Sequence, residues 1–192
     1  MPTLSRNAQV LRYILQVAPG IGHTKLAKYA YLADLEALRY LGRPVSRFHY
    51  VWDKHGPFDS RGFFAARREL LNGEYITENK VDCGGYTGYE MMPTSQAVDY
   101  GFPVAEAAVL DYAATTYLAK TARELCDEVV YSTEPMRAAK PGKPLPMGKV
   151  KRRKTVPRGF NLERMLAGEA SAKSGRVRPL ARVIDGLRAR AC

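Results

Sequence analysis

At 192 residues, the chain is long enough for one domain with an extension, and its 46% hydrophobic residues are enough for a packed core. No run approaches the ~18 apolar residues of a membrane span, the first seven residues lack a secretion-signal pattern, and the three cysteines are odd in number and far apart. These features predict a cytoplasmic protein that does not contact a membrane.

The net charge of +11 is concentrated at one end of the chain. Residues 140–192 contain 15 Lys and Arg against 3 Asp and Glu, whereas the preceding residues contain 15 basic and 16 acidic side chains. The body is therefore nearly neutral. A basic tail of this kind is typical of contact with nucleic acid, contact with an acidic partner surface, or simple solubility.

Hydrophobic spacing predicts two helices in the first quarter of the chain. The first covers residues 4–18, with apolar side chains on one stripe. The second covers residues 25–41, for which Thr24 is the expected N-cap. Gly42 and Pro44 then end the helix, since glycine adopts the left-handed C-terminal conformation and proline cannot continue the helix.

The middle of the chain alternates between short β-prone segments and a helix. Residues 49–52 are β-prone, and Asp59 is expected to cap a third helix that reaches residue 71. Two further β-like segments, 76–81 and 86–92, are separated by a Gly-rich loop and predict a hairpin. A helix followed by a hairpin is also the order of a winged-helix unit.

Two more helices are expected before the composition changes. Pro103 precedes a helix over residues 104–118. Thr121 and Glu124 have the spacing of a capping box, which predicts a separate short helix over residues 121–130.

The tail has two expected parts. Residues 140–156 combine Pro, Gly and Lys, which predicts a mobile and self-repelling linker. Its candidates for phosphate contact are Lys149, Lys151, Arg152, Arg153 and Lys154. A final helix over about 179–191 has one apolar face that is suited to docking on a partner. That face consists of Leu180, Val183, Ile184 and Leu187.

Catalytic and metal-binding patterns are weak. Asp53, His55 and Asp59 surround a Gly-Pro turn, and histidine is suited to acid–base chemistry. However, all three lie within seven residues at spacings common in turns, and Asp59 is already expected to cap a helix. His and Cys residues do not have the spacing of a zinc site. We therefore expect no enzymatic activity, no cofactor and no metal.

Aromatic residues are dense between positions 29 and 58, mostly at periodic positions that predict a packed core. A second hypothesis places part of this cluster on a surface that binds a partner, because aromatic side chains are enriched at interface hot spots. The residues of this hypothesis are Trp52, His55, Gly56, Pro57 and Phe58.

The order of these motifs resembles the Panacea domain, which is found in SocA-like antitoxins and in phage-associated proteins. The resemblance covers roughly residues 4–143, and Lys54-His55 departs from the small residue or Tyr that usually precedes the Gly-Pro. The matched pieces are Lys25-Leu26, Tyr31-Leu32-Ala33-Asp34, Gly42-Arg43-Pro44, 50–57, 121–130 and 132–146.

Together, pattern and resemblance predict a mainly α protein with a small β-hairpin, that is, an α+β fold with a winged-helix-like helix–hairpin element. The expected parts are a Panacea-like domain (1–143), a basic linker (144–160) and a basic helical extension (161–192).

The resemblance implies an antitoxin that neutralises a cognate toxin by direct protein binding, and in the adaptor type it implies a protease as a further partner. The alternative is a winged-helix-like DNA-binding regulator that reads DNA with residues 59–71. A neutral body is a poor electrostatic match for phosphate, so nucleic-acid contact is expected mainly from the basic tail.

Overall fold

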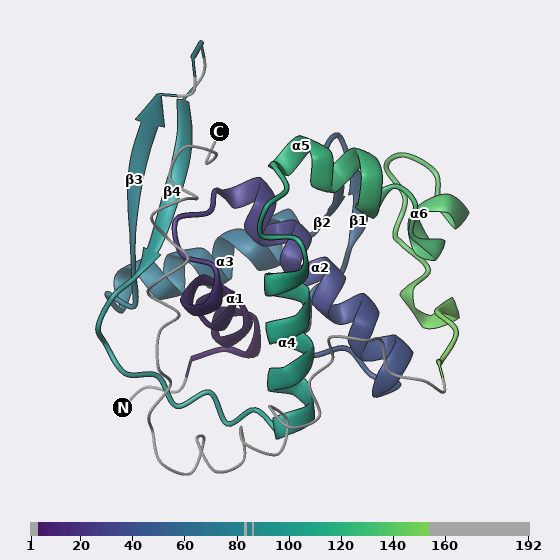
Figure 1. Cartoon of the computed structure of the whole chain (residues 1–192), viewed down its shortest axis with the longest axis horizontal. Helices are drawn as coiled ribbons and strands as arrows, with labels where there is room; N and C mark the ends of the chain where they lie inside the picture. The colour runs from purple at the N-terminus through teal and green to yellow at the C-terminus, as the bar shows by residue number, and fades with distance from the viewer. Residues whose placement is uncertain (1–3, 83, 86, 154–192) are drawn as a thin grey trace.

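The computed structural model describes residues 4–82, 84–85 and 87–153. In this part of the chain, the α+β prediction is confirmed, because helices pack around a central helix and two small antiparallel sheets lie at the periphery (Figure 1). The basic helix expected over about 179–191 lies outside the described residues, as does the end of the predicted linker.

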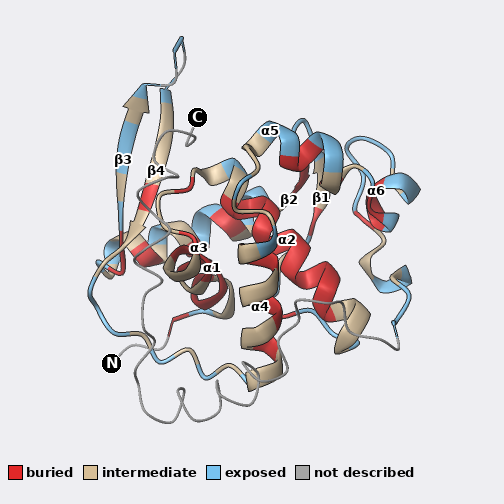
Figure 2. Ribbon diagram, viewed as in Figure 1, coloured by how far each residue is buried: buried red, intermediate tan, exposed pale blue. Residues whose placement is uncertain are grey.

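The central helix is α2 (His23–Tyr40), which contacts both α1 (Arg6–Val17) and α4 (Val104–Thr116). Every residue of α2 from position 26 to position 37 is buried (Figure 2). The predicted apolar face of this helix is therefore core, but the opposite face is buried as well. Three charged residues share this burial, namely Lys28, Asp34 and Glu36.

The expected N-cap of this helix is wrong. The helix begins at His23 with Gly22 as N-cap, and the exposed Thr24 lies inside the first turn. In contrast, Ser5 caps α1 through its hydroxyl, which accepts a hydrogen bond from the Ala8 amide.

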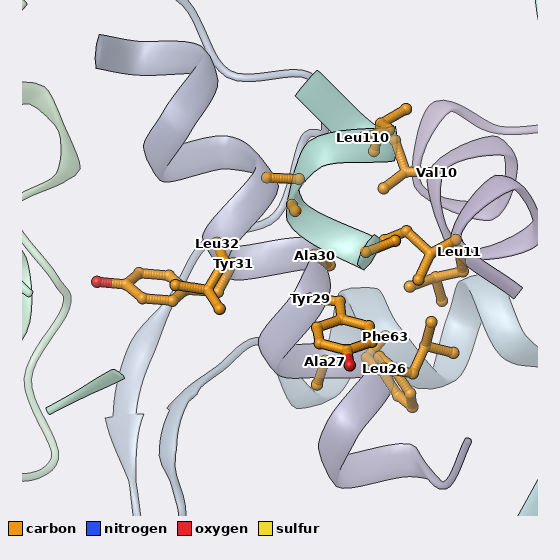
Figure 3. Close-up of a cluster of buried hydrophobic side chains, with 14 of the residues drawn as sticks. Val10, Leu11, Leu26, Ala27, Tyr29, Ala30, Tyr31, Leu32, Phe63 and Leu110 are labelled. Atoms are coloured by element: carbon orange, nitrogen blue, oxygen red, sulfur yellow. The ribbon is translucent and has the colours of Figure 1, made fainter. Parts of the chain in front are cut away.

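The aromatic side chains of α2 point in different directions (Figure 3). Tyr29 lies near Leu26 and Phe63 between the helices, and its hydroxyl donates to the Tyr117 carbonyl at 3.0 Å. Tyr31 points the other way, where its hydroxyl is hydrogen-bonded to Thr133 at 2.6 Å. The dense aromatics of this helix are thus core, as periodicity predicts.

After α2, the chain forms β1 (Val51–Asp53), β2 (Gly56–Phe58) and α3 (Ser60–Asn72). Strands β1 and β2 form a hairpin, in which Val51 is opposite Phe58. The predicted cap of α3 is confirmed, because the Asp59 carboxylate accepts a hydrogen bond from the Gly62 amide at 2.9 Å.

The predicted second hairpin is confirmed as β3 (Ile76–Asp82) and β4 (Thr87–Pro93), which follow α3 directly. It projects from the helical body (Figure 1). Its base is attached through Met91, which is buried and whose carbonyl accepts a hydrogen bond from the Gly20 amide at 2.9 Å.

The capping box is also confirmed, with Thr121 and Glu124 satisfying each other's backbone amides at the start of α5 (Ala122–Glu124). The expected single helix over 121–130 differs in one respect, because α5 continues as the π-helix η1 (Leu125–Val130). The short helix α6 (Glu134–Ala138) follows.

Residues 142–150 pack beside β1, where composition predicts a mobile linker. The Trp52 amide donates to the Lys143 carbonyl at 3.0 Å, and the Leu145 amide donates to the Tyr50 carbonyl at 2.9 Å. Leu145 is itself buried. The 3-10 turn η2 (Met147–Lys149) follows, and the Arg153 amide then donates to the Arg39 carbonyl. Composition does not predict this docking, because only folding brings the hydrogen-bonding groups of β1 next to this segment.

This docking makes the effect of truncation depend on position. Ending the chain after Arg153 keeps every contact described above, so this truncation is the reference. Ending it after Pro141 removes the bonds to β1 and the burial of Leu145, which is worth about 1.5–3 kcal/mol. We expect the melting temperature to fall by roughly 3–10 °C. Equal thermal denaturation curves for the two truncations would contradict the docking.

Candidate protein-binding surface

One face of α3 lies outside the core. Phe64 on this face is 43% exposed, and it is the one large hydrophobic side chain classed as exposed in the described part of the chain. The other outward residues lie three or four positions from it or next to it, as helical geometry requires. We call this face the α3 surface, and it consists of Arg61, Phe64, Ala65 and Arg68.

The Phe64 ring rests on other aromatic side chains. Its centroid lies 5.6 Å from that of Phe63, 5.9 Å from that of Phe58 and 6.2 Å from that of His23, each in an edge-to-face arrangement. Such pairs are favourable beyond simple area burial. The ring is therefore held in place while part of it remains open to solvent.

The acidic side chains of α3 and its cap are used inside the fold. The Asp59 carboxylate accepts from the amides of His49 and Gly62, both at 2.9 Å. The Glu69 carboxylate accepts from the amide and the hydroxyl of Ser5 at 2.7 and 2.5 Å. Both carboxylates are therefore engaged in hydrogen bonds, and among the described residues neither forms an ion pair with Arg61 or Arg68.

Arg67 is also occupied, because its guanidinium pairs with both carboxylate oxygens of Glu78 on β3. His23 Nε2 lies 2.6 Å from the same carboxylate, and its ring stacks on Tyr89 of β4 at 4.7 Å. The hydrogen bonds from Arg67 are the main cause that lowers the pKa of Glu78. This cluster joins the hairpin to α2 and α3.

Arg61 and Arg68 are the remaining charges on the α3 surface. Both are exposed, and neither forms an ion pair within the described residues. The α3 surface is therefore positively charged around an apolar centre.

Strand β2, which leads into α3, is held by a buried lysine. Lys28 is 2% exposed, and its ammonium donates to the Pro57 carbonyl at 2.9 Å. Burial lowers the pKa of Lys28 to about 8. Gly56 has φ +90°, a backbone conformation that favours glycine.

A second buried charge fixes the segment before β1. Asp34 accepts hydrogen bonds from the amides of Val45 and Ser46, both at 2.8 Å, and from the hydroxyls of Ser46 and Tyr50. Burial raises the pKa of Asp34, and these hydrogen bonds oppose that rise. An unsatisfied buried carboxylate would be costly, so the network ties residues 45–50 to α2.

The residues predicted to form a partner-binding surface around the turn differ in their exposure. His55 is exposed, whereas Gly56 and Pro57 are buried. Trp52 is half-buried, with its ring 6.2 Å from that of Tyr131. Phe58, also half-buried, is the one member of this set whose ring contacts Phe64.

The two carboxylates considered for catalysis have backbone amides as partners. Asp53 accepts from the Lys54 amide next to it, and Asp59 caps α3. The His55 backbone carbonyl accepts from the thiol of Cys126 at 3.5 Å. Among the described residues, no group of three or more His, Cys, Asp and Glu side chains is arranged to hold a metal ion.

The basic candidates of the tail are described only in part. Lys149, Lys151, Arg152 and Arg153 are exposed, and the Arg152 guanidinium lies 3.5 Å from the Tyr40 carbonyl oxygen. The predictions for Lys154 and for the apolar face of the last helix concern residues outside the described part. That face is Leu180, Val183, Ile184 and Leu187.

Sequence reasoning missed Phe64 and Lys28. For Phe64 a signal exists, because Phe63, Ala66 and Leu70 share a helical face that leaves its neighbour pointing elsewhere. For Lys28 no sequence signal exists, since a lysine on a helix is usually exposed.

Searches among models of known families, curated proteins and solved structures find no match to this chain. Within the described residues, no helix has the length and apolar character needed to span a membrane.

The buried Lys28 makes the free energy of unfolding depend on pH. Between pH 8 and 10.5, the unfolded chain holds a proton that folded Lys28 has largely released, so stability rises with pH. The slope should reach up to about 1.4 kcal/mol per pH unit. Burial raises the pKa of the Cys126 thiol above 9.0, which opposes this trend at higher pH, so pH 8 to 9 is the informative window.

Urea unfolding across that window measures the slope. Lys28→Met should reduce it, because the titrating amine is removed while the chain length of the side chain is nearly kept. Lys54→Met, on the exposed turn, is the matched control and should retain the wild-type slope. The same slope for wild type and Lys28→Met would exclude Lys28 as its source.

Proposed function

We propose that the chain is a cytoplasmic antitoxin that neutralises a toxin protein by direct, stoichiometric binding. The observation that carries the proposal is the α3 surface, an exposed phenylalanine that rests on an ordered aromatic base and is flanked by two arginines. Aromatic residues and arginine dominate the energetics of protein interfaces.

The resemblance to the Panacea domain supports the same function. Several of the residues that carry it are buried and support the scaffold, including Asp34, Gly56 and Pro57. Phe64, in contrast, lies outside the matched pieces. The residues that carry the resemblance and the α3 surface are therefore different parts of the molecule.

Coexpression with the product of the neighbouring gene tests the proposal. The wild-type chain should restore growth, copurify with the toxin and saturate it at a fixed ratio, since binding involves no turnover. His55→Ala should restore growth equally well, because this exposed side chain lies in the β1–β2 turn and is not among the ring contacts of Phe64.

Two outcomes would contradict stoichiometric binding. Rescue by amounts of protein far below those of the toxin would indicate turnover. Loss of rescue in His55→Ala, with folding and toxin binding unchanged, would indicate catalysis at the turn.

A DNA-binding regulator is the second candidate. The observation that favours it is the direct succession of α3 and the β3–β4 hairpin, together with the exposed Arg61 and Arg68. The charge of the hairpin weighs against it, because the negative charge of the exposed Asp82 offsets the positive charge of the exposed Lys80 on the same strand. A DNA-reading wing usually benefits from net positive charge.

If antitoxin activity is the function, binding to duplex DNA should be weak, independent of sequence and confined to the tail. Five phosphate contacts would give a slope of roughly −4 to −5 in log affinity against log salt. Replacing the five contact residues by alanine should abolish this binding; they are Lys149, Lys151, Arg152, Arg153 and Lys154. Sequence-specific binding that survives the replacement would favour the regulator.

A further inference from the structure

We propose that the α3 surface binds an acidic segment of the partner protein and that an apolar side chain of this segment covers Phe64. This inference rests on the proposed function, because it assumes that the partner is a protein. It adds the chemical class of the segment and the residues that select it.

The spacing of the α3 surface places two cations around one apolar centre. Arg61 precedes Phe64 by three positions and Arg68 follows it by four, so all three lie on one side of the helix. Ala65 beside them is exposed and small, which leaves space for a side chain of the partner against the Phe64 ring. The surface thus offers an apolar contact with a guanidinium on either side.

The choice of an acidic partner follows from charge. Asp59 and Glu69 are engaged with backbone amides and with Ser5, and Arg67 is engaged with Glu78. The two outward arginines therefore have no carboxylate partner on α3 itself. Arginine binds carboxylates through paired hydrogen bonds, so an acidic segment would gain two such contacts and a basic segment would be repelled.

The apolar centre favours protein over nucleic acid. Phe64 and Ala65 have no hydrogen-bond donors for phosphates or base edges, yet they occupy the middle of the outward face. An exposed aromatic ring that a partner fully desolvates is instead typical of a protein hot spot. Two arginines alone also give a small phosphate footprint.

The test selects peptides on the full-length chain. The probe is a displayed library of random 12-residue peptides, with counter-selection on a triple variant that combines Phe64→Ala, Arg61→Glu and Arg68→Glu. This step removes peptides that bind the basic tail, because the variant keeps the tail unchanged. The enriched peptides should carry a net negative charge and at least one Leu, Phe or Trp.

Binding of the enriched peptides is then measured for separate variants. Phe64→Ala and the pair Arg61→Glu/Arg68→Glu should each weaken affinity at least tenfold, whereas Phe64→Leu should largely retain it. A peptide with Lys in place of its acidic residues should recover affinity for the charge-reversed pair. Arg123→Glu, on a side chain that is 92% exposed on α5, is the matched control and should have no effect. The arginine variants should melt at the wild-type temperature, because they alter exposed side chains. Phe64→Ala should melt somewhat lower, because it loses the ring contacts with His23, Phe58 and Phe63. Affinities are therefore measured well below its melting temperature, and Phe64→Leu is the conservative comparison.

Several outcomes would overturn the inference. These are the absence of any enriched peptide, enrichment of neutral or basic peptides, and equal affinity for Phe64→Ala and wild type. Loss of duplex DNA binding in Arg61→Glu/Arg68→Glu, with no enriched peptide, would assign the surface to nucleic acid.

Toxin neutralisation separates this inference from the proposed function. If wild type and Phe64→Ala neutralise the neighbouring gene product equally, the inference fails and the antitoxin proposal stands. If that gene product is not toxic, the antitoxin proposal fails, while the peptide selection still tests the chemistry of the α3 surface.

Discussion

The burial of α2 over residues 26–37 is the constraint on which the rest of the structure depends. A helix that is covered on all sides must satisfy its polar side chains within the protein, because an unpaired buried charge costs several kcal/mol. Lys28 and Asp34 meet this requirement by bonding to segments that follow α2 in the chain. Those segments are therefore held in defined positions against the helix.

These buried charges influence the position of the α3 surface through a series of hydrogen bonds along the chain. Asp34 fixes residues 45–50, which lead into β1, and Lys28 holds the Pro57 carbonyl in the middle of β2. Asp59 then caps α3 immediately after β2. The two buried charges of α2 thus set the start and the direction of α3, and with them the position of Phe64.

The division between scaffold and surface gives a physical basis for the proposed function. The buried charges cannot change singly without leaving a partner unsatisfied, whereas exposed residues on α3 can change at little cost to stability. A protein built in this way can keep its fold while its outward residues adapt to different partners. The cluster of His23, Glu78 and Arg67 adds rigidity by joining the hairpin to the same helices.

The sequence by itself determined those features that depend on local chemistry and periodicity. The helical spacing of α1 and α2, the Asp59 cap, the Thr121–Glu124 capping box and the β3–β4 hairpin all follow from residues close together in the chain. Only the tertiary structure decided what depends on distant segments. It buried Lys28 and Asp34, docked Leu145 beside β1, turned Gly56 and Pro57 inward and left Phe64 outside. Each of these results depends on which surfaces meet after folding. Helical spacing alone places Phe64 off the Phe63, Ala66 and Leu70 face, but only the fold decides that no other segment covers it.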